Sequence, residues 1–336
     1  MTTTRALPTT ALGETRIGVQ GYGCMGISEF YGPTDADEAR ATLEHALELG
    51  VTLFDTADMY GSGHNEEFVG EFVRAHRENV VLATKFGIVR KADEPTYRGI
   101  DNSPDYIRRA VDASLRRLGI DVIDLYYMHR RDPQVPIEET VGVMAELVAA
   151  GKVRQLGLSE VTGPELRAAH AVHPIAAVQS EWSVFSRDVE RAVVPAAAEL
   201  GVTFVPYSPL GRGFLTGTVA ATGELAEGDT RRAFPRLSGE NAVRNAELLA
   251  PLRAVAEARG ITPGQVALAW VHARARVHNL SVAPIPGTRR RDRLAENVAA
   301  ATVELTADEL ATLEPIAERV AGNRYADMNF TSAGRE

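Results

Sequence analysis

The chain has 336 residues, of which 45% are hydrophobic and 24% are charged, proportions typical of a globular protein and unlike those of a disordered or fibrous one. Its 36 basic and 45 acidic side chains give a formal net charge of −9 at pH 7, so no overall positive field favours a nucleic acid or an anionic membrane as partner. Cys24 is the only cysteine, which excludes an intrachain disulfide and a cysteine-based zinc site.

Short apolar runs alternate along the chain with amphipathic segments of helix length. We predict strands at residues 17–21, 51–54, 80–84, 122–127, 153–158, 176–179, 202–206 and 281–284. The string Glu-Leu-Gly-Val-Thr occurs at 48–52 and at 199–203, where a helix is expected to end at glycine and a strand to begin. Eight such alternations predict a parallel sheet closed into a (β/α)8 TIM barrel with helices outside. We expect one barrel domain over residues 1–336, with an insertion at about 210–240 and a carboxyl-terminal tail at about 301–336.

An open, doubly wound sheet is the main alternative fold. Gly21, Gly23 and Gly26 spell the G-x-G-x-x-G pattern of a dinucleotide-binding turn, in which the third glycine already lies in the opening of a helix. Here residues 27–33, including Gly32-Pro33, come before any helical periodicity begins. We therefore interpret the pattern as a glycine-rich loop after the first strand of a barrel.

Polar side chains follow the predicted strands. In a barrel of this type the active site is built at the carboxyl ends of the strands, so these positions should meet at one rim. Lys85 follows an apolar run that is expected to be interior, and a desolvated ammonium needs a charge partner, which Asp55 can supply from the neighbouring strand. A lysine held near a phenol is expected to lower the pKa of a tyrosine from its ordinary value of ~10. The strand-end positions are Asp55, Lys85, His129, Ser159 with Glu160, Gln179, Tyr207 and residues 287–289.

These residues resemble the catalytic tetrad of the aldo-keto reductases. The segment Asp55-Thr-Ala-Asp-Met-Tyr60-Gly, together with Lys85 and His129, is similar to the family's four catalytic positions, with Tyr60 as the proton donor. Segments at 23–26, 151–159, 207–213 and 285–289 are similar to family segments in the same order, most like the branch of auxin-induced and perakine reductases. The resemblance implies NADPH-dependent hydride transfer to an aldehyde or ketone, with no metal.

The resemblance also implies where the cofactor binds. Ser159 and Gln179 match positions that bind the nicotinamide carboxamide, and Tyr207 matches the ring on which the nicotinamide stacks. Arginines at the start of the last helix favour NADPH over NADH, because a helix amino terminus with arginines suits a phosphate. Glu160 stands where many members have asparagine, and Gly287 where lysine is common. The full implied set is Gly23, Cys24, Met25, Ser159, Glu160, Gln179, Tyr207, Ser208, Leu210, Gly211, Arg212, Gly213, Gly287, Thr288, Arg289, Arg293, Glu296 and Asn297.

Two other functions compete with a reductase. The potassium-channel β-subunits resemble this family, which allows a nicotinamide-binding sensor with little turnover. Scattered aspartate and histidine would suit a metal-dependent barrel hydrolase. Phe30, Tyr31, Phe86, Trp182 and Tyr325 either line an apolar substrate pocket or pack within the fold. No signal peptide and no apolar run of roughly 18 residues occurs, so we expect a cytoplasmic protein that binds neither membrane nor nucleic acid.

Overall fold

In the computed structural model, the strands form a parallel sheet that curves into a nearly closed barrel, as the sequence predicts. The structure describes residues 7–91, 93–94, 97–218, 225 and 228–336. Seven strands pair in the order β11-β10-β9-β8-β5-β4-β3, and every pair is parallel. Their bounds are β3 Tyr22–Gly23, β4 Leu53–Asp55, β5 Val81–Phe86, β8 Ile123–Met128, β9 Val153–Ser159, β10 Ile175–Glu181 and β11 Thr203–Tyr207.

Residues 281–284 occupy the eighth position of the barrel. Val282 forms a parallel bridge with Phe204 on β11, and the amide of Gly21 donates to the carbonyl of Pro284 over 2.9 Å. These contacts join β11 to the chain just before β3 and close the ring. The open-sheet alternative for the glycine pattern is therefore wrong, although Gly26 does lie in a single helical turn, α1 (Met25–Ser28).

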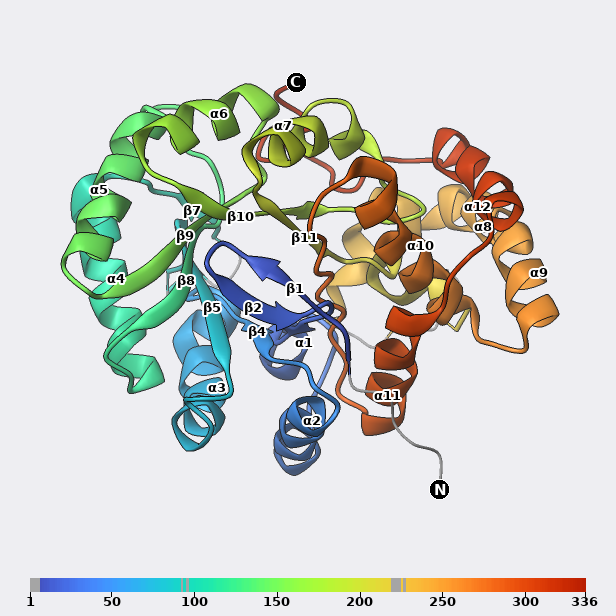
Figure 1. The fold of residues 1–336 in the computed structure, drawn as a ribbon, viewed down its shortest axis with the longest axis horizontal. Coiled ribbons are helices and arrows are strands. Elements are labelled where there is room, and N and C mark those ends of the chain that lie inside the picture. Colours follow the sequence, from blue (N-terminus) through green and yellow to red (C-terminus); the bar gives the residue numbers. More distant parts are fainter. Residues whose placement is uncertain (1–6, 92, 95–96, 219–224, 226–227) are drawn as a thin grey trace.

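Helices surround the strands on the outside of the barrel (Figure 1). Both copies of the repeated string join a helix end to a strand, because α2 ends at Glu48 before β4 and α7 ends at Leu200 before β11. The outer helices are α2 Ala36–Glu48, α3 His64–Ala75, α4 Pro104–Leu118, α5 Ile137–Ala149, α6 Gly163–Val172, α7 Val193–Leu200, α10 Pro263–His278 and α11 Arg291–Ala299. Within the described parts of the chain, no helix combines the length and the apolar character needed to cross a bilayer.

The predicted first strand, residues 17–21, does not belong to the barrel wall. Residues Thr15–Gly18 form β2, which pairs antiparallel with β1 (Thr9–Leu12). This hairpin covers the amino ends of the strands, where Thr203 donates to the carbonyl of Ala11 over 2.9 Å (Figure 1). Its apolar side chains Leu12 and Ile17 are buried in the inner core, so the short apolar stretch predicted as a barrel strand belongs in part to a plug.

The described parts of the insertion and the tail return to the carboxyl ends of the strands. In the insertion, the amide of Thr230 donates to the carbonyl of Phe30 over 3.0 Å, which joins it to the loop after β3. A second hairpin, β6 (Ile88–Val89) with β7 (Gly99–Ile100), follows β5. The further elements are η3 Gly211–Thr216, η5 Thr230–Ala233, η6 Pro235–Leu237, α8 Gly239–Glu247, α9 Ala250–Arg259, α12 Ala307–Leu313 and η8 Glu314–Arg319. That residues 1–336 form one domain stays a prediction.

The buried hairpin plug should contribute to stability. Leu12 has no exposed surface, so Leu12→Ala should lower the free energy of unfolding by about 2–5 kcal/mol, through lost burial and the cavity left behind. Val243 is 59% exposed on α8, and the matched change Val243→Ala should alter stability by less than about 0.5 kcal/mol. Urea unfolding of both variants measures this. Equal, small effects would mean that the hairpin is not packed into the barrel.

Candidate active site

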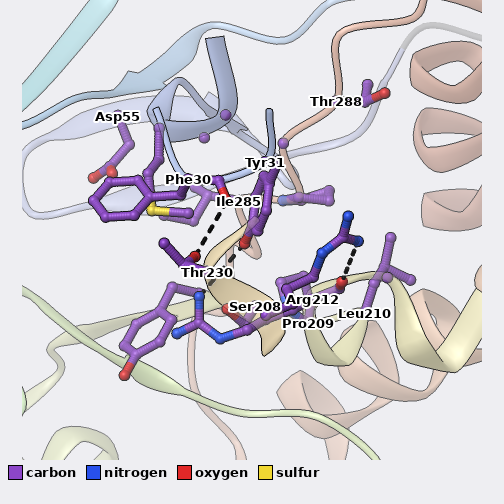
Figure 2. Close-up of a pocket in the computed structure, with 18 of the residues that line it drawn as sticks. Phe30, Tyr31, Asp55, Ser208, Pro209, Leu210, Arg212, Thr230, Ile285 and Thr288 are labelled. Carbon is purple, nitrogen blue, oxygen red and sulfur yellow. Dashed lines mark hydrogen bonds between the residues drawn. The ribbon is translucent and has the colours of Figure 1, made fainter. Parts of the chain in front are cut away.

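A cavity of about 580 Å³ opens at the carboxyl ends of the strands. Its lining comes from the loops after β3, β4, β8 and β11, from the insertion, from residues 285–297 and from the tail at Tyr325. Figure 2 shows Asp55 among the lining side chains, with Thr230 hydrogen-bonded to the carbonyl of Phe30 and Arg212 to the hydroxyl of Tyr31. Aromatic and apolar walls with a few polar groups are typical of a small-molecule site.

A buried ion pair lies at the floor of the cavity. Asp55 pairs with Ala83 in the parallel register of β4 and β5, so Lys85, two residues further along β5, points to the same face of the sheet. Lys85 has no exposed surface, and its Nζ donates to the carboxylate of Asp55 and, over 2.8 Å, to the carbonyl of Thr56. Gln179 donates to the other oxygen of Asp55 over 2.8 Å. Burial lowers the pKa of Lys85, but Asp55 and Tyr60 outweigh it and raise the pKa overall, which keeps the ammonium charged.

Tyr60 and His129 lie beside this ion pair. Tyr60 begins a short helical turn after β4, and Nζ of Lys85 lies 5.2 Å from the centroid of its ring. His129 directly follows β8, and its ring meets that of Tyr60 edge-on, with centroids 5.9 Å apart. The structure thus brings together Asp55, Lys85, Tyr60 and His129, the predicted catalytic residues.

The protonation of these two rings differs in part from the sequence prediction. Burial raises the pKa of Tyr60 above its ordinary value of 10.0 and outweighs the lowering effect of Lys85, so the prediction of a lowered pKa is wrong. Burial, with Arg130 and Lys85 nearby, holds the pKa of His129 well below 6.5. At neutral pH the site therefore presents a protonated phenol and a neutral imidazole, and Nδ1 of that imidazole has no hydrogen-bond partner among the described residues.

Most of the predicted cofactor positions line the cavity. Four lie outside the lining as the described residues define it: Cys24, Ser159, Glu160 and Gly211. Cys24 is fully buried, and burial raises the pKa of its thiol. Of the expected pocket aromatics, Phe86 and Trp182 are also fully buried in the core and lie outside that lining. Those that line the cavity are Gly23, Met25, Gln179, Tyr207, Ser208, Leu210, Arg212, Gly213, Gly287, Thr288, Arg289, Arg293, Glu296 and Asn297 from the predicted set, and Phe30, Tyr31 and Tyr325.

Two glycines allow the backbone on either side of the cavity to come close together. A Cβ on Gly23 would lie 2.7 Å from the carbonyl oxygen of Ile285, and a Cβ on Gly287 would lie 2.4 Å from the carbonyl oxygen of Gly23. Any larger residue would push the loop after β3 away from residues 285–288. The glycine at 287 is therefore a packing requirement of this chain.

The basic end of the cavity lies at the amino terminus of α11. Arg289 donates to the carbonyls of Tyr31, Gly32 and Pro33 over 2.6–3.1 Å, so it ties this end to the loop after β3. The N-cap residue of α11, Arg290, makes no side-chain capping bond, and the start of a helix is a place where an anion can bind. Arg293 lines the cavity from the first turn of the helix.

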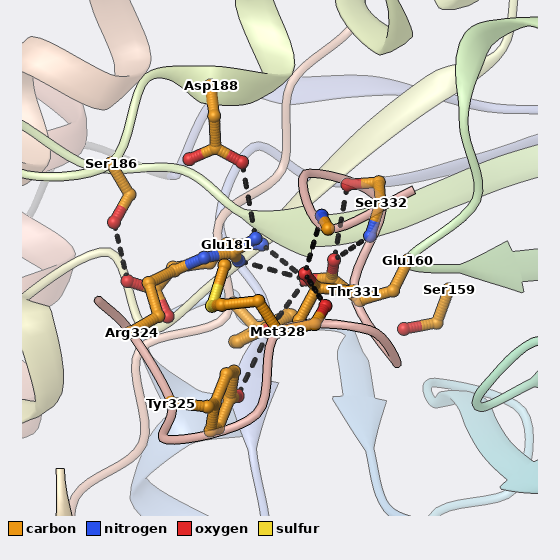
Figure 3. Close-up of polar contacts among 12 residues, drawn as sticks. Ser159, Glu160, Glu181, Ser186, Asp188, Arg324, Tyr325, Met328, Thr331 and Ser332 are labelled. Carbon is orange, nitrogen blue, oxygen red and sulfur yellow. Dashed lines mark hydrogen bonds and ion pairs between the residues drawn. The ribbon is translucent and has the colours of Figure 1, made fainter. Parts of the chain in front are cut away.

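Glu160 is engaged with the carboxyl-terminal tail (Figure 3). Its carboxylate accepts hydrogen bonds from the hydroxyl of Tyr207 over 2.6 Å and from the amide of Ser332 over 2.9 Å, and it pairs with Arg324 over 3.1 Å. Burial raises its pKa, but Arg324 and Arg130, with these hydrogen bonds, lower it to about 2. The side chain predicted to contact the cofactor thus holds the tail and the Tyr207 ring in place.

Sequence reasoning missed the arginines of this region. Arg130 lines the cavity and is 8% exposed, and its position directly after His129 was the available signal. Arg324 pairs with Glu160 and, over 3.2 Å, with Asp188, although 164 residues separate it from Glu160. Nothing local in the sequence indicates that pairing.

The buried Glu160 carboxylate should make the free energy of unfolding depend on pH in the acid range. Because its folded pKa is depressed from 4.5 to about 2, the stabilisation is fully present above pH 4.5 and is lost as the pH falls toward 2. Glu160→Gln should be less stable than the wild type at pH 7, by about 3 kcal/mol at 1.36 kcal/mol per pKa unit, and should lose less on acidification. Urea unfolding at several pH values gives the difference in stability at pH 7 and the loss of stability on acidification. Glu240→Gln, whose side chain is 90% exposed, is the control, and a variant whose acid dependence equals that of the wild type would contradict this role.

Comparison with known proteins places the chain in a family. A model of the Aldo/keto reductase family matches residues 21–318. The chain is 43% identical over 330 residues to the NADP(+) aldo-keto reductase yakc of Schizosaccharomyces pombe, covering 95% of each chain. Its structure matches a glycerol dehydrogenase of Gluconobacter oxydans with a TM-score of 0.82 at 26% identity, covering 96% of this chain and 97% of that one. It matches an aldo-keto reductase of Klebsiella pneumoniae in complex with NADPH with a TM-score of 0.70 at 26% identity, covering 96% and 100%. The chain therefore belongs to the aldo/keto reductase family.

Proposed function

We propose that this protein reduces the carbonyl group of an aldehyde or ketone with NADPH, with Tyr60 as the proton donor. One observation carries the proposal: the Asp55–Lys85 ion pair is buried directly beside Tyr60 and His129 at the floor of a cavity. NADPH, when bound, supplies the hydride that forms the new C–H bond and leaves as NADP(+). The electron pair of the carbonyl π bond forms the new O–H bond with the proton that Tyr60 donates.

The residues around the carbonyl oxygen suit a charge that develops during the reaction. Tyr60 is protonated and His129 is neutral at neutral pH, so both can donate hydrogen bonds to that oxygen. Lys85 is charged and lies behind Tyr60, where it stabilises the phenolate left after proton transfer. Asp55 compensates the lysine charge. Such donors are already in position before the reaction and need no reorganisation.

The cavity fits a nicotinamide dinucleotide phosphate. Tyr207 offers a ring beside Gln179 at one end, and the uncapped start of α11 with Arg293 offers a phosphate site at the other. Gly213, which lines the cavity, adopts a positive φ in the loop after β11, a backbone that suits close approach of a pyrophosphate. The yeast relative is named as an NADP(+) enzyme, and the bacterial structure is a complex with NADPH. A cytoplasmic location and a place in the auxin-induced and perakine reductase branch belong to this proposal, and no observation at the site favours the sensor alternative.

Removal of the proposed proton donor should abolish most turnover. Tyr60→Phe removes only the hydroxyl, and the loss of a positioned general acid should lower kcat by about 10²–10⁴-fold. NADPH binding should stay close to that of the wild type, since the ring remains. The rate of NADPH oxidation with a reactive aromatic aldehyde gives kcat, and a fluorescence titration gives the dissociation constant of NADPH. Undiminished turnover by this variant would remove Tyr60 from the reaction.

Cofactor choice should depend on Arg293. Arg293→Ala removes a charged donor from the proposed phosphate site, so the dissociation constant for NADPH should rise by about 10–100-fold. Affinity for NADH, which has no 2′-phosphate, should change little. Arg253→Ala, at a cation outside the lining of this cavity, is the control. Equal losses of affinity for NADPH and NADH would mean that the 2′-phosphate binds elsewhere.

A further inference from the structure

The turn that carries Tyr60 has an unfavourable backbone conformation. The three residues after Tyr60 all lie in the left-handed region, with φ of 56° at Gly61, 54° at Ser62 and 96° at Gly63. Two of them are glycines, but Ser62 has a Cβ and is strained there. Such a backbone persists only where the surrounding structure holds it. The position of the Tyr60 side chain should therefore depend on contacts from outside the turn.

An ion pair between Glu29 and Arg90 supplies contacts on both sides of Tyr60. The carboxylate of Glu29 accepts a hydrogen bond from the amide of Gly61 over 2.8 Å. Nη1 of Arg90 donates to the carbonyl of Met59 over 3.1 Å, and it lies 2.9 Å and 3.0 Å from the two carboxylate oxygens of Glu29. The two bonded peptide groups are the ones that flank the α-carbon of Tyr60. Holding both of them fixes the direction in which the Tyr60 side chain leaves the backbone.

The ion pair is shielded from water. The side chain of Arg90 is 14% exposed and that of Glu29 is 25% exposed. Salt screens a partly buried pair less than an exposed one, so this pair can hold a backbone in place. Arg98 lies 3.7 Å from the same carboxylate and adds a second positive charge.

The loop that carries Glu29 is itself anchored. The carbonyl of the next residue, Phe30, accepts from the amide of Thr230 over 3.0 Å and from its hydroxyl over 3.2 Å. The ring of Phe30 meets that of Tyr60 edge-on, with centroids 6.2 Å apart. Glu29 is thus held by the insertion, independently of the turn that it contacts.

We propose that the Glu29–Arg90 pair positions the hydroxyl of Tyr60 for proton transfer to the carbonyl oxygen. Neither residue belongs to the lining of the cavity as the described residues define it, so both act through Tyr60 and are positioning residues. Lys85 stabilises the charge left on Tyr60, whereas this pair sets where the hydroxyl lies. This inference rests on the proposed function.

The first test separates turnover from cofactor binding. Glu29→Ala and Arg90→Met each remove one partner of the pair, and each should lower kcat by about 10–100-fold, because a small displacement of a reacting group can cost that much. The dissociation constant of NADPH should stay that of the wild type. Glu29→Gln, whose amide oxygen can still accept from Gly61, should lose less. NADPH oxidation with a reactive aromatic aldehyde gives kcat, and a fluorescence titration gives the dissociation constant.

The second test asks whether the pair acts through Tyr60. The same substitution, Glu29→Ala, is made in the Tyr60→Phe protein, which has no hydroxyl to position. There it should change the residual kcat by less than about twofold, because two residues that serve one interaction are not additive. A general effect on the fold would lower kcat by the same factor in both proteins.

A matched control breaks an ion pair elsewhere. Glu146 pairs with Arg108 over 2.7 Å on the outer helices, and their side chains are 60% and 46% exposed. Glu146→Ala should leave kcat unchanged in the wild type and in Tyr60→Phe. If Glu29→Ala does not fold, Glu29→Gln must show a smaller loss of kcat that disappears in Tyr60→Phe.

Three results would overturn the inference. They are an unchanged kcat in Glu29→Ala and Arg90→Met, an equal loss of kcat from Glu29→Ala with and without the Tyr60 hydroxyl, and a weakened affinity for NADPH that accounts for the loss. A wild-type protein that neither binds nor oxidises NADPH, or full turnover by Tyr60→Phe, would instead contradict the proposed function itself. The two failures are therefore distinguishable.

Discussion

The buried ion pair between Asp55 and Lys85 is the constraint on which the site depends. A protein tolerates a buried ion pair only when the two charges are well oriented and their remaining donors and acceptors have hydrogen-bond partners. Here the parallel register of β4 and β5 sets the pair, and the carbonyl of Thr56 and the amide of Gln179 complete it. Removal of either partner would leave an uncompensated charge at the floor of the cavity.

The same burial sets the protonation of the neighbouring rings. Desolvation keeps the proton on Tyr60 and keeps His129 neutral, so both rings can donate hydrogen bonds into the cavity. The cation of Lys85 does not make Tyr60 acidic in advance. In the proposed reaction it would stabilise the phenolate only once the proton has left, which is the differential stabilisation that catalysis requires.

A second buried carboxylate, Glu160, organises the other side of the cavity. It stands just after β9 with a positive φ of 52°, an uncommon backbone conformation that the surrounding contacts must hold in place. Its bonds to Tyr207, Arg324 and Ser332 anchor the tail that carries Tyr325 to the lining. Asp55 thus lies among the proposed catalytic groups, while Glu160 holds the walls of the cavity that surround them.

The barrel and the cluster around Lys85 could be predicted because their signals are local. Apolar runs ending in polar residues mark the strands, and parallel strands bring those ends to one rim, as for Asp55 and His129. The hairpin of β1 and β2 was missed because a short apolar stretch does not distinguish a strand of the barrel wall from one that plugs its end. The pairing of Glu160 with Arg324 depends on a tail 164 residues away, and the raised pKa of Tyr60 depends on a depth of burial that no sequence pattern gives.

A crystal structure of the protein with NADP(+) bound is the most direct measurement of the central claim. The account predicts that the nicotinamide stacks on Tyr207, with its reactive carbon turned toward the hydroxyl of Tyr60 and the ring of His129. A nicotinamide bound elsewhere, or one separated from Tyr60 by another side chain, would contradict the claim.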